Sequence, residues 1–179
     1  KQDRETFWLK ASKSIDWIIP PKIALDDSNS PFSKWFPDGK MNSCFNAVDR
    51  HVLAGRWEQT AIQYESPITG QSASMSYGEL KKQTEKFAGM LNEQGLKKGD
   101  RVIIYMPMIK EAVIAMLGCA RIGVVHSVVF GGFAAAELAK RINDCKPKLI
   151  VSASCGHEPN RLVLYKPLLD QAIQQSIYK

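Results

Sequence analysis

The sequence contains no apolar run long enough to cross a membrane and no block of basic residues. Its most apolar region, residues 112–136, is interrupted by Arg121, His126 and Ser127, whereas a spanning helix needs about 20 mostly apolar residues in succession. Lys and Arg outnumber Asp and Glu by 24 to 18, giving a formal charge of +6, but the charges are dispersed along the chain. We therefore predict neither a membrane span nor a nucleic-acid-binding arm. The excess of basic residues is interpreted as charge on a solvated surface, which could also bind one anionic ligand.

Cysteines and histidines are few and widely spaced in this sequence. The four cysteines form no Cys-x-x-Cys pair, and the three histidines have no ligand-spaced Cys, Asp or Glu beside them. We therefore expect reduced, structural thiols and no metal site. His126 interrupts an apolar strand and is interpreted as a core histidine, and Asp49-Arg50-His51 as charge on a helix surface. A Gly-x-Ser-x-Gly elbow is also absent, so hydrolase chemistry is unsupported and no catalytic residue is assigned.

The composition is that of an ordinary globular protein, with 45% hydrophobic and 23% charged residues, which excludes collagen-like and wholly disordered chains. From residue 60 onward, strand and helix patterns alternate with short links, and this alternation predicts an α/β fold with a mainly parallel sheet and flanking helices. The predicted elements are a β-hairpin over residues 60–65 and 71–75, a helix from Ser76 to Gly95, a strand over 101–106, a helix over 109–122, a strand over 124–130, a helix over 134–143, a strand over 148–152 and a helix that opens at Pro167.

Two of these helices carry specific sequence signals. Ser76 and Glu79 have the spacing of a capping box, in which each side chain satisfies a backbone N–H at the start of a helix. The helix over residues 109–122 is apolar nearly all round and ends at Gly123, so we expect it to be buried on most sides.

Residues 1–58 have a different texture, with all four tryptophans and little sustained periodicity. We predict one short helix over residues 4–14 and another over residues 42–54, joined by an extended segment. This part is interpreted as an irregular helical extension that wraps onto the larger α/β portion.

Two segments could bind a ligand. In the first, a strand leads through Gly131-Gly132 into a helix, where glycine allows close backbone approach and helix N–H groups attract anions. In the second, a loop over residues 154–161 follows a strand, and its Arg161 could hold a phosphate. The residues alone leave the alternatives open that the first is a tight structural turn and Arg161 an ordinary surface arginine.

Several longer motifs resemble those of one enzyme group, the short-chain acyl-CoA synthetases, which comprise acetyl- and propionyl-CoA synthetases among the AMP-forming, adenylate-forming enzymes. The resemblance covers nearly the whole chain and corresponds to the amino-terminal third of these enzymes. The motifs are Phe7-Trp8, Ile15-Asp16-Trp17, Lys34-Trp35-Phe36, Asn42 through His51, Met75-Ser76-Tyr77-Gly78-Glu79-Leu80, Lys98-Gly99-Asp100-Arg101-Val102, Tyr105-Met106-Pro107-Met108, Ala120-Arg121-Ile122-Gly123, and His126 through Phe133.

The resemblance implies a ligase that activates a short-chain carboxylate with ATP to an acyl-adenylate and then transfers the acyl group to CoA. CoA and ATP would be co-substrates, with Mg²⁺ accompanying ATP. In such enzymes, the position that corresponds to Lys179 is followed by the phosphate loop, the adenine and acyl sites and a small carboxyl-terminal domain. This fragment alone is therefore expected to be inactive. Residues 1–58 would be the amino-terminal extension and residues 59–179 the first part of the large AMP-binding domain.

The resemblance also implies which residues meet CoA. Gly132 matches the backbone point that CoA approaches, and Glu158-Pro159-Asn160-Arg161 matches a loop whose arginine pairs with a CoA phosphate. Acetate-specific members often carry arginine where this chain has Glu158, and the Glu-Pro-x-Arg form resembles the propionyl-preferring branch. Propionate is thus favoured over acetate, with a location in the mitochondrial matrix if the protein is eukaryotic and the cytoplasm if it is bacterial. The alternative is a non-catalytic α/β module that binds CoA or a nucleotide.

Overall fold

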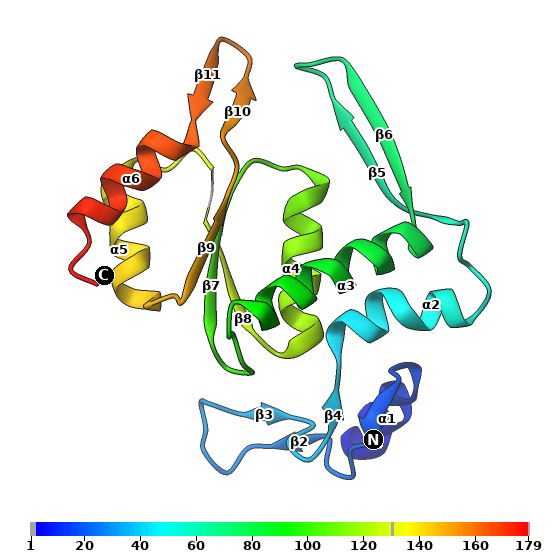
Figure 1. Ribbon diagram of the computed structural model, residues 1–179. Coiled ribbons are helices and arrows are strands. Elements are labelled where there is room, and N and C mark those ends of the chain that lie inside the picture. Colours follow the sequence, from blue (N-terminus) through cyan, green and yellow to red (C-terminus); the bar gives the residue numbers. More distant parts are fainter. Residues whose placement is uncertain (1–2, 130, 179) are drawn as a thin grey trace.

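The computed structural model describes residues 3–129 and 131–178, and its centre is a three-stranded parallel sheet in the order β8-β7-β9 (Figure 1). The strands are β7 (Arg101–Tyr105), β8 (Val125–Val129) and β9 (Leu149–Ser152). The middle strand, β7, pairs with β8 from Arg101↔Val125 and with β9 from Val102↔Leu149. This architecture confirms the α/β class and the parallel sheet that the sequence predicts.

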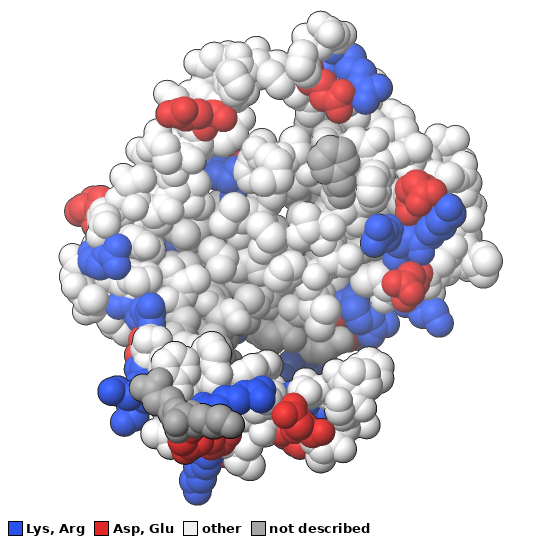
Figure 2. Space-filling view, turned by 180° about the vertical axis from the view of Figure 1, so that it is seen from behind, with Lys and Arg blue, Asp and Glu red and all other residues white. Residues whose placement is uncertain are grey.

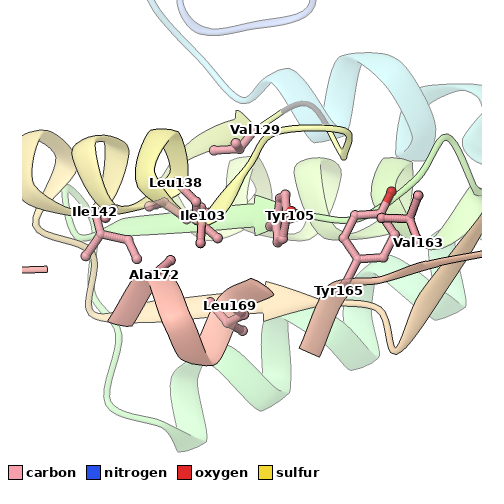
Figure 3. Packing of buried hydrophobic residues seen from close by; sticks show 11 residues of the cluster. Ile103, Tyr105, Val129, Leu138, Ile142, Val163, Tyr165, Leu169 and Ala172 are labelled. Carbon is pink, nitrogen blue, oxygen red and sulfur yellow. The ribbon is translucent and has the colours of Figure 1, made fainter. Parts of the chain in front are cut away.

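The middle strand is buried on both faces, because its successive side chains point to opposite sides of the sheet. Ile103 and Tyr105 pack with helices α5 (Ala135–Cys145) and α6 (Tyr165–Gln175), as Figure 3 shows. Val102 and Ile104 pack on the other face, with α3 (Tyr77–Glu93) and α4 (Lys110–Ile122). A strand covered on both faces reads as a continuous apolar run, which is the pattern of this segment.

The local signals at the helix ends behave as the sequence predicts. The Ser76 hydroxyl accepts a hydrogen bond from the Glu79 N–H at 3.2 Å, and the Glu79 carboxylate accepts one from the Ser76 N–H at 2.8 Å. Helix α4 ends at Gly123, whose φ of 75° lies in the left-handed region, where glycine is favoured. The expected burial of α4 is also confirmed, since it contacts β7 and α3 in one cluster and the segment around Cys44 in another.

Two antiparallel hairpins project from the end of the sheet at which the parallel strands finish (Figure 1). One consists of β5 (Thr60–Ser66) and β6 (Gln71–Ser76), as predicted. The other consists of β10 (Cys155–Glu158) and β11 (Arg161–Leu164), in a segment that we expected to be a loop. The strands of this hairpin have four residues each, too few to produce a clear alternating pattern.

The amino-terminal part contains more β structure than predicted. Helix α1 (Arg4–Ala11) and a 3₁₀ turn match the first expected helix, and a π-helical turn (Phe45–Asp49) followed by α2 (Arg50–Leu53) matches the second. Between them lie two short antiparallel ladders that the sequence analysis missed. They pair β1 (Trp17–Ile19) with β4 (Lys40–Met41) and β2 (Leu25–Asp26) with β3 (Lys34–Trp35).

A buried ion pair joins this extension to the α/β portion. Arg121, in the last turn of α4, donates to both carboxylate oxygens of Asp49 at 3.0 and 2.8 Å and to the Thr84 hydroxyl at 3.2 Å. The Asn42 side-chain amide donates to the backbone carbonyl of Arg121 at 2.9 Å. Asp49 is only 7% exposed, so its interpretation as helix-surface charge is wrong.

The four cysteines are free thiols, and two of them lie in the core. Cys44 and Cys119 are fully buried. Burial raises the pKa of Cys119 to about 11 and is also the main cause of the raised pKa of Cys44. Both thiols are therefore protonated near neutral pH and act as small apolar groups, in agreement with the expected structural role.

The ion pair between Asp49 and Arg121 gives a first prediction. Asp49→Ala would leave the Arg121 guanidinium buried without a counter-charge, so we expect the free energy of unfolding to fall by about 3 kcal/mol. The double variant Asp49→Leu/Arg121→Met, which removes both charges, should recover most of this loss. Urea unfolding measures both. The matched control is Asp16→Asn, because Asp16 pairs with Arg50 at the surface and its loss should cost less than about 1 kcal/mol. Equal losses for Asp49→Ala and Asp16→Asn would contradict a structural role for the buried pair.

The partly buried His126 gives a second prediction, on the pH dependence of stability. Burial lowers the pKa of its imidazole below the value of about 6.5 for an exposed histidine. Its contribution to stability is therefore complete above about pH 6.5 and is lost as the pH falls through the lowered folded-state pKa.

We expect His126→Gln to lose less free energy of unfolding than the wild type between neutral pH and about pH 5. Urea unfolding at a series of pH values measures this difference. The pKa of His51 is also lowered, by burial and by Arg56, but His51 is present in both proteins and cancels. Parallel stability curves for the two proteins would contradict the prediction.

Candidate functional site

A cleft of about 530 Å³ opens at the carboxyl end of the sheet, and its lining comes from both projecting hairpins. It is lined by residues 64–69 of the β5–β6 hairpin, residues 106–109 after β7, the end of β8, the glycine turn and β10. Figure 2 shows this region as a hollow between two arms, above a face whose centre carries few charges. In open α/β sheets, ligands bind at this edge, beyond the ends of the parallel strands.

The structure brings two of the predicted site residues together at this cleft. Gly132, in the exposed turn between β8 and α5, and Glu158, at the end of β10, both line it. Pro159 and Asn160 form the exposed tip of the β10–β11 hairpin, and Arg161 begins β11. These last three residues stand next to the cleft at the tip of its wall and do not line it.

Arg161 is paired within its own hairpin. Its Nε donates to the Glu158 carboxylate at 2.7 Å, across the register pair Glu158↔Arg161. This hydrogen bond, together with the charge of Glu158, raises the pKa of the Arg161 guanidinium. Its side chain is 66% exposed, and within the described residues its two Nη groups have no hydrogen-bond partner, so they remain able to donate to an anion.

Two tyrosines that the sequence analysis did not assign to the site, Tyr105 and Tyr165, pack against the turn at Gly131-Gly132. The Tyr105 hydroxyl donates to the backbone carbonyl of Phe133 at 2.8 Å, and Tyr165 lines the cleft beside Gly131 and Gly156. Both tyrosines are nearly or fully buried. Tyr105 ends an apolar strand and begins a motif shared with the resembled family, but neither signal indicates where its hydroxyl is directed.

Other features of the described residues do not add a second site of this kind. Depressions of about 620 and 550 Å³ lie along α1 and beside the β5–β6 hairpin, and neither contains a predicted site residue. Over residues 3–129 and 131–178, no group of three or more His, Cys, Asp or Glu side chains is arranged to hold a metal ion. None of the helices in these ranges has the length and apolar character needed to cross a bilayer.

Comparison with known families matches two models to this chain. The model described as "AMP-binding enzyme" matches residues 49–176, which include the whole parallel sheet and the cleft. The model described as "Acetyl-coenzyme A synthetase N-terminus" matches residues 1–47, which form most of the extension.

Curated proteins with the same pattern are similar to nearly all of this chain. It is 49% identical over 177 residues to "Acyl-CoA synthetase short-chain family member 3, mitochondrial" of Rattus norvegicus, covering 99% of this chain and 26% of the relative. The protein of the same name from Homo sapiens is 48% identical with the same coverage. "Acetyl-coenzyme A synthetase" of Streptomyces avermitilis is 47% identical over 175 residues, covering 98% of this chain and 27% of the relative. The chain thus spans about a quarter of the length of these relatives.

Proposed function

This chain belongs to the family of AMP-binding enzymes, and on that premise we propose that it forms the amino-terminal part of an ATP-dependent short-chain carboxylate–CoA ligase. The reaction would convert propionate or acetate, ATP and CoA to acyl-CoA, AMP and pyrophosphate through an acyl-adenylate. Similarity to relatives named for short-chain acyl-CoA and acetyl-CoA synthesis supports the reaction class. We favour propionate because the Glu158-Pro159-Asn160-Arg161 sequence resembles the propionyl-preferring branch.

The role proposed for the cleft is to receive the nucleotide end of CoA. The glycine turn and the β10–β11 hairpin, which the family resemblance assigns to CoA, border one cleft at the ligand-binding edge of the sheet. This common cleft is the observation that carries the proposal. Gly132 would let CoA approach the backbone, and the exposed guanidinium of Arg161 would donate its Nη groups to a phosphate.

The remaining parts of the proposal concern the rest of the enzyme. Residues 1–58 would be the extension and residues 59–179 the first part of the large domain, which by itself would be inactive. Mg²⁺ would accompany ATP and would be held by residues outside the described ranges, in which no three His, Cys, Asp or Glu side chains are grouped to hold a metal ion. Relatives include a protein named mitochondrial and bacterial proteins, and a location in the mitochondrial matrix or the bacterial cytoplasm is proposed accordingly.

The sharpest test concerns Arg161 in the complete ligase. Arg161→Ala removes a charge-assisted contact to a phosphate, so we expect the KM for CoA to rise about ten- to hundredfold. The KM for ATP and for the carboxylate should stay nearly constant, because adenylation precedes CoA entry. Arg161→Lys should recover only part of the loss, since an ammonium keeps the charge and not the planar fork. Steady-state kinetics with CoA measure the change in KM. Dephospho-CoA, which lacks the 3′-phosphate, tests whether that phosphate is the partner of Arg161.

Two controls make the Arg161 test specific. Lys140→Ala removes a surface cation that pairs with Glu137 on α5 and should leave the KM for CoA unchanged. Glu158→Gln removes the carboxylate that competes with phosphate for Arg161, and should lower the KM for CoA by up to about fivefold, the range for an exposed ion pair. If CoA turnover by Arg161→Ala equals that of the wild type, Arg161 is a surface arginine and the proposed phosphate contact is wrong. A complete protein that binds CoA without forming an acyl-adenylate would instead favour the non-catalytic module.

Gly132 provides an independent test of the same cleft. Gly132→Val places a branched side chain in the turn where CoA would approach, so we expect acyl-CoA formation to fall by at least about tenfold. Carboxylate-dependent pyrophosphate exchange, which needs no CoA, should fall much less. The two half-reactions are measured separately on one preparation. Equal losses in both would indicate that Gly132 serves folding and not CoA binding.

A further inference from the structure

The side chain of Tyr165 fills the space between the two segments that border the cleft. A Cβ atom added to Gly131 in the turn would lie 2.1 Å from the Tyr165 hydroxyl oxygen, and one added to Gly156 in β10 would lie 2.8 Å from its ring. Such distances are too short for atoms that are not bonded. Both segments therefore approach the tyrosine ring as closely as glycine backbone allows.

The ring itself is held from several directions. Tyr165 is 4% exposed, and its backbone N–H donates to the carbonyl of Ser154 at 3.0 Å. Its ring packs edge-to-face on Tyr105 with centroids 4.9 Å apart. Figure 3 shows the two tyrosines side by side at the end of the apolar cluster. Because Tyr105 also binds the carbonyl of Phe133, the pair supports the turn at Gly131 and immediately after Gly132.

Tyr165 is also directly connected to the hairpin. Strand β11 runs from Arg161 at the tip of the hairpin to Leu164 at its base, and α6 begins at Tyr165, so Tyr165 is joined directly to the strand that carries Arg161. The Cε1 edge of the ring faces the turn, 3.0 Å from a Cβ placed on Gly131, and the opposite Cε2 edge faces β10, 2.8 Å from a Cβ placed on Gly156, while the hydroxyl lies close to both segments. The width of this one side chain therefore sets the separation of turn and hairpin.

We propose that Tyr165 is a positioning residue for CoA, which acts by fixing the distance between the glycine turn and the β10–β11 hairpin. This inference rests on the proposed function, since it requires CoA to contact both segments. A ring that only stabilised the fold would affect both half-reactions alike. A spacer between two CoA-contacting segments affects the binding of CoA and not the adenylation step, because CoA takes no part in adenylation.

The test uses Tyr165→Leu and Tyr165→Phe in the complete ligase. Tyr165→Leu narrows the spacer and weakens the binding of CoA, so we expect the KM for CoA to rise about tenfold, with kcat and pyrophosphate exchange within about twofold of wild type. Tyr165→Phe keeps the ring between the two segments and should stay within about threefold of the wild-type KM for CoA. A Tyr165→Phe effect as large as that of Tyr165→Leu would overturn the inference, since the hydroxyl and not the width of the ring would then matter.

A second substitution checks the contact itself. Gly131→Ala directs a methyl group into the Tyr165 hydroxyl and should raise the KM for CoA by itself. Adding Tyr165→Leu removes the obstruction, so the double variant should bind CoA better than the sum of the two single effects predicts. Strict additivity would overturn the inference.

Leu169→Ala is the matched control for stability. Leu169 lies one turn further along α6 and belongs to the same apolar cluster as Tyr165, but is not among the nearest neighbours of Gly131 or Gly156. It should lower the melting temperature without changing the KM for CoA. If Tyr165→Leu behaves like Leu169→Ala while Arg161→Ala still impairs CoA use, the spacer role is wrong and the proposed CoA site stands. If Arg161→Ala and Gly132→Val leave CoA use unchanged, the CoA role proposed for the cleft fails, and a complete protein that forms no acyl-adenylate would refute the ligase itself.

Discussion

The contact between Asp49 and Arg121 holds the extension in place on the α/β portion. The extension has few buried apolar side chains of its own, chiefly Ala24, Cys44 and Val48, so it cannot form an independent core. Arg121 places a cation next to Asp49 and, through its backbone carbonyl, accepts a hydrogen bond from Asn42. Because the buried guanidinium Nε has no hydrogen-bond partner among residues 3–129 and 131–178, the pair adds less stability than its short distances suggest. Its main effect is to fix one position for the extension, since any other would leave the two charges apart in the interior.

The same helix that carries Arg121 also connects the extension to the cleft. Helix α4 packs on Val102 and Ile104 of β7, and the opposite side of that strand presents Tyr105 to the glycine turn. Strand β7 therefore supports helix α4 on one face of the sheet and the glycine turn on the other, because its successive side chains point to opposite faces. A shift in the position of α4 would therefore displace the glycine turn, because close-packed interiors have low compressibility and transmit strain.

Sequence patterns predicted those parts of the molecule that are determined locally. The capping box at Ser76, the left-handed end of α4 at Gly123 and the buried strand β7 depend on neighbouring residues and were correct. The short ladders of the extension and the β10–β11 hairpin were missed, because strands of two to four residues have too few positions for an alternating pattern. The pairing of Asp49 with Arg121 and the packing of Tyr165 on Gly131 join residues far apart in the sequence, where no local spacing applies.

The β10–β11 hairpin allows the binding of CoA and the choice of acid to be considered separately, although the family resemblance links both to Glu158. Glu158 is part of the motif that suggests the propionyl-preferring branch, yet in the structure its carboxylate binds Arg161, at the mouth of the cleft proposed for CoA. On the proposed function, CoA is common to the acetate and propionate reactions, so a charge at this position would alter the affinity for CoA and would not by its own contacts select the acid. An exposed ion pair exchanges readily with solvent and other anions, so on the proposed function Glu158 would compete with a CoA phosphate for Arg161. On the proposed function, the substitution of glutamate for arginine at this position weakens the hold on CoA, and the choice of acid depends on residues elsewhere in the enzyme.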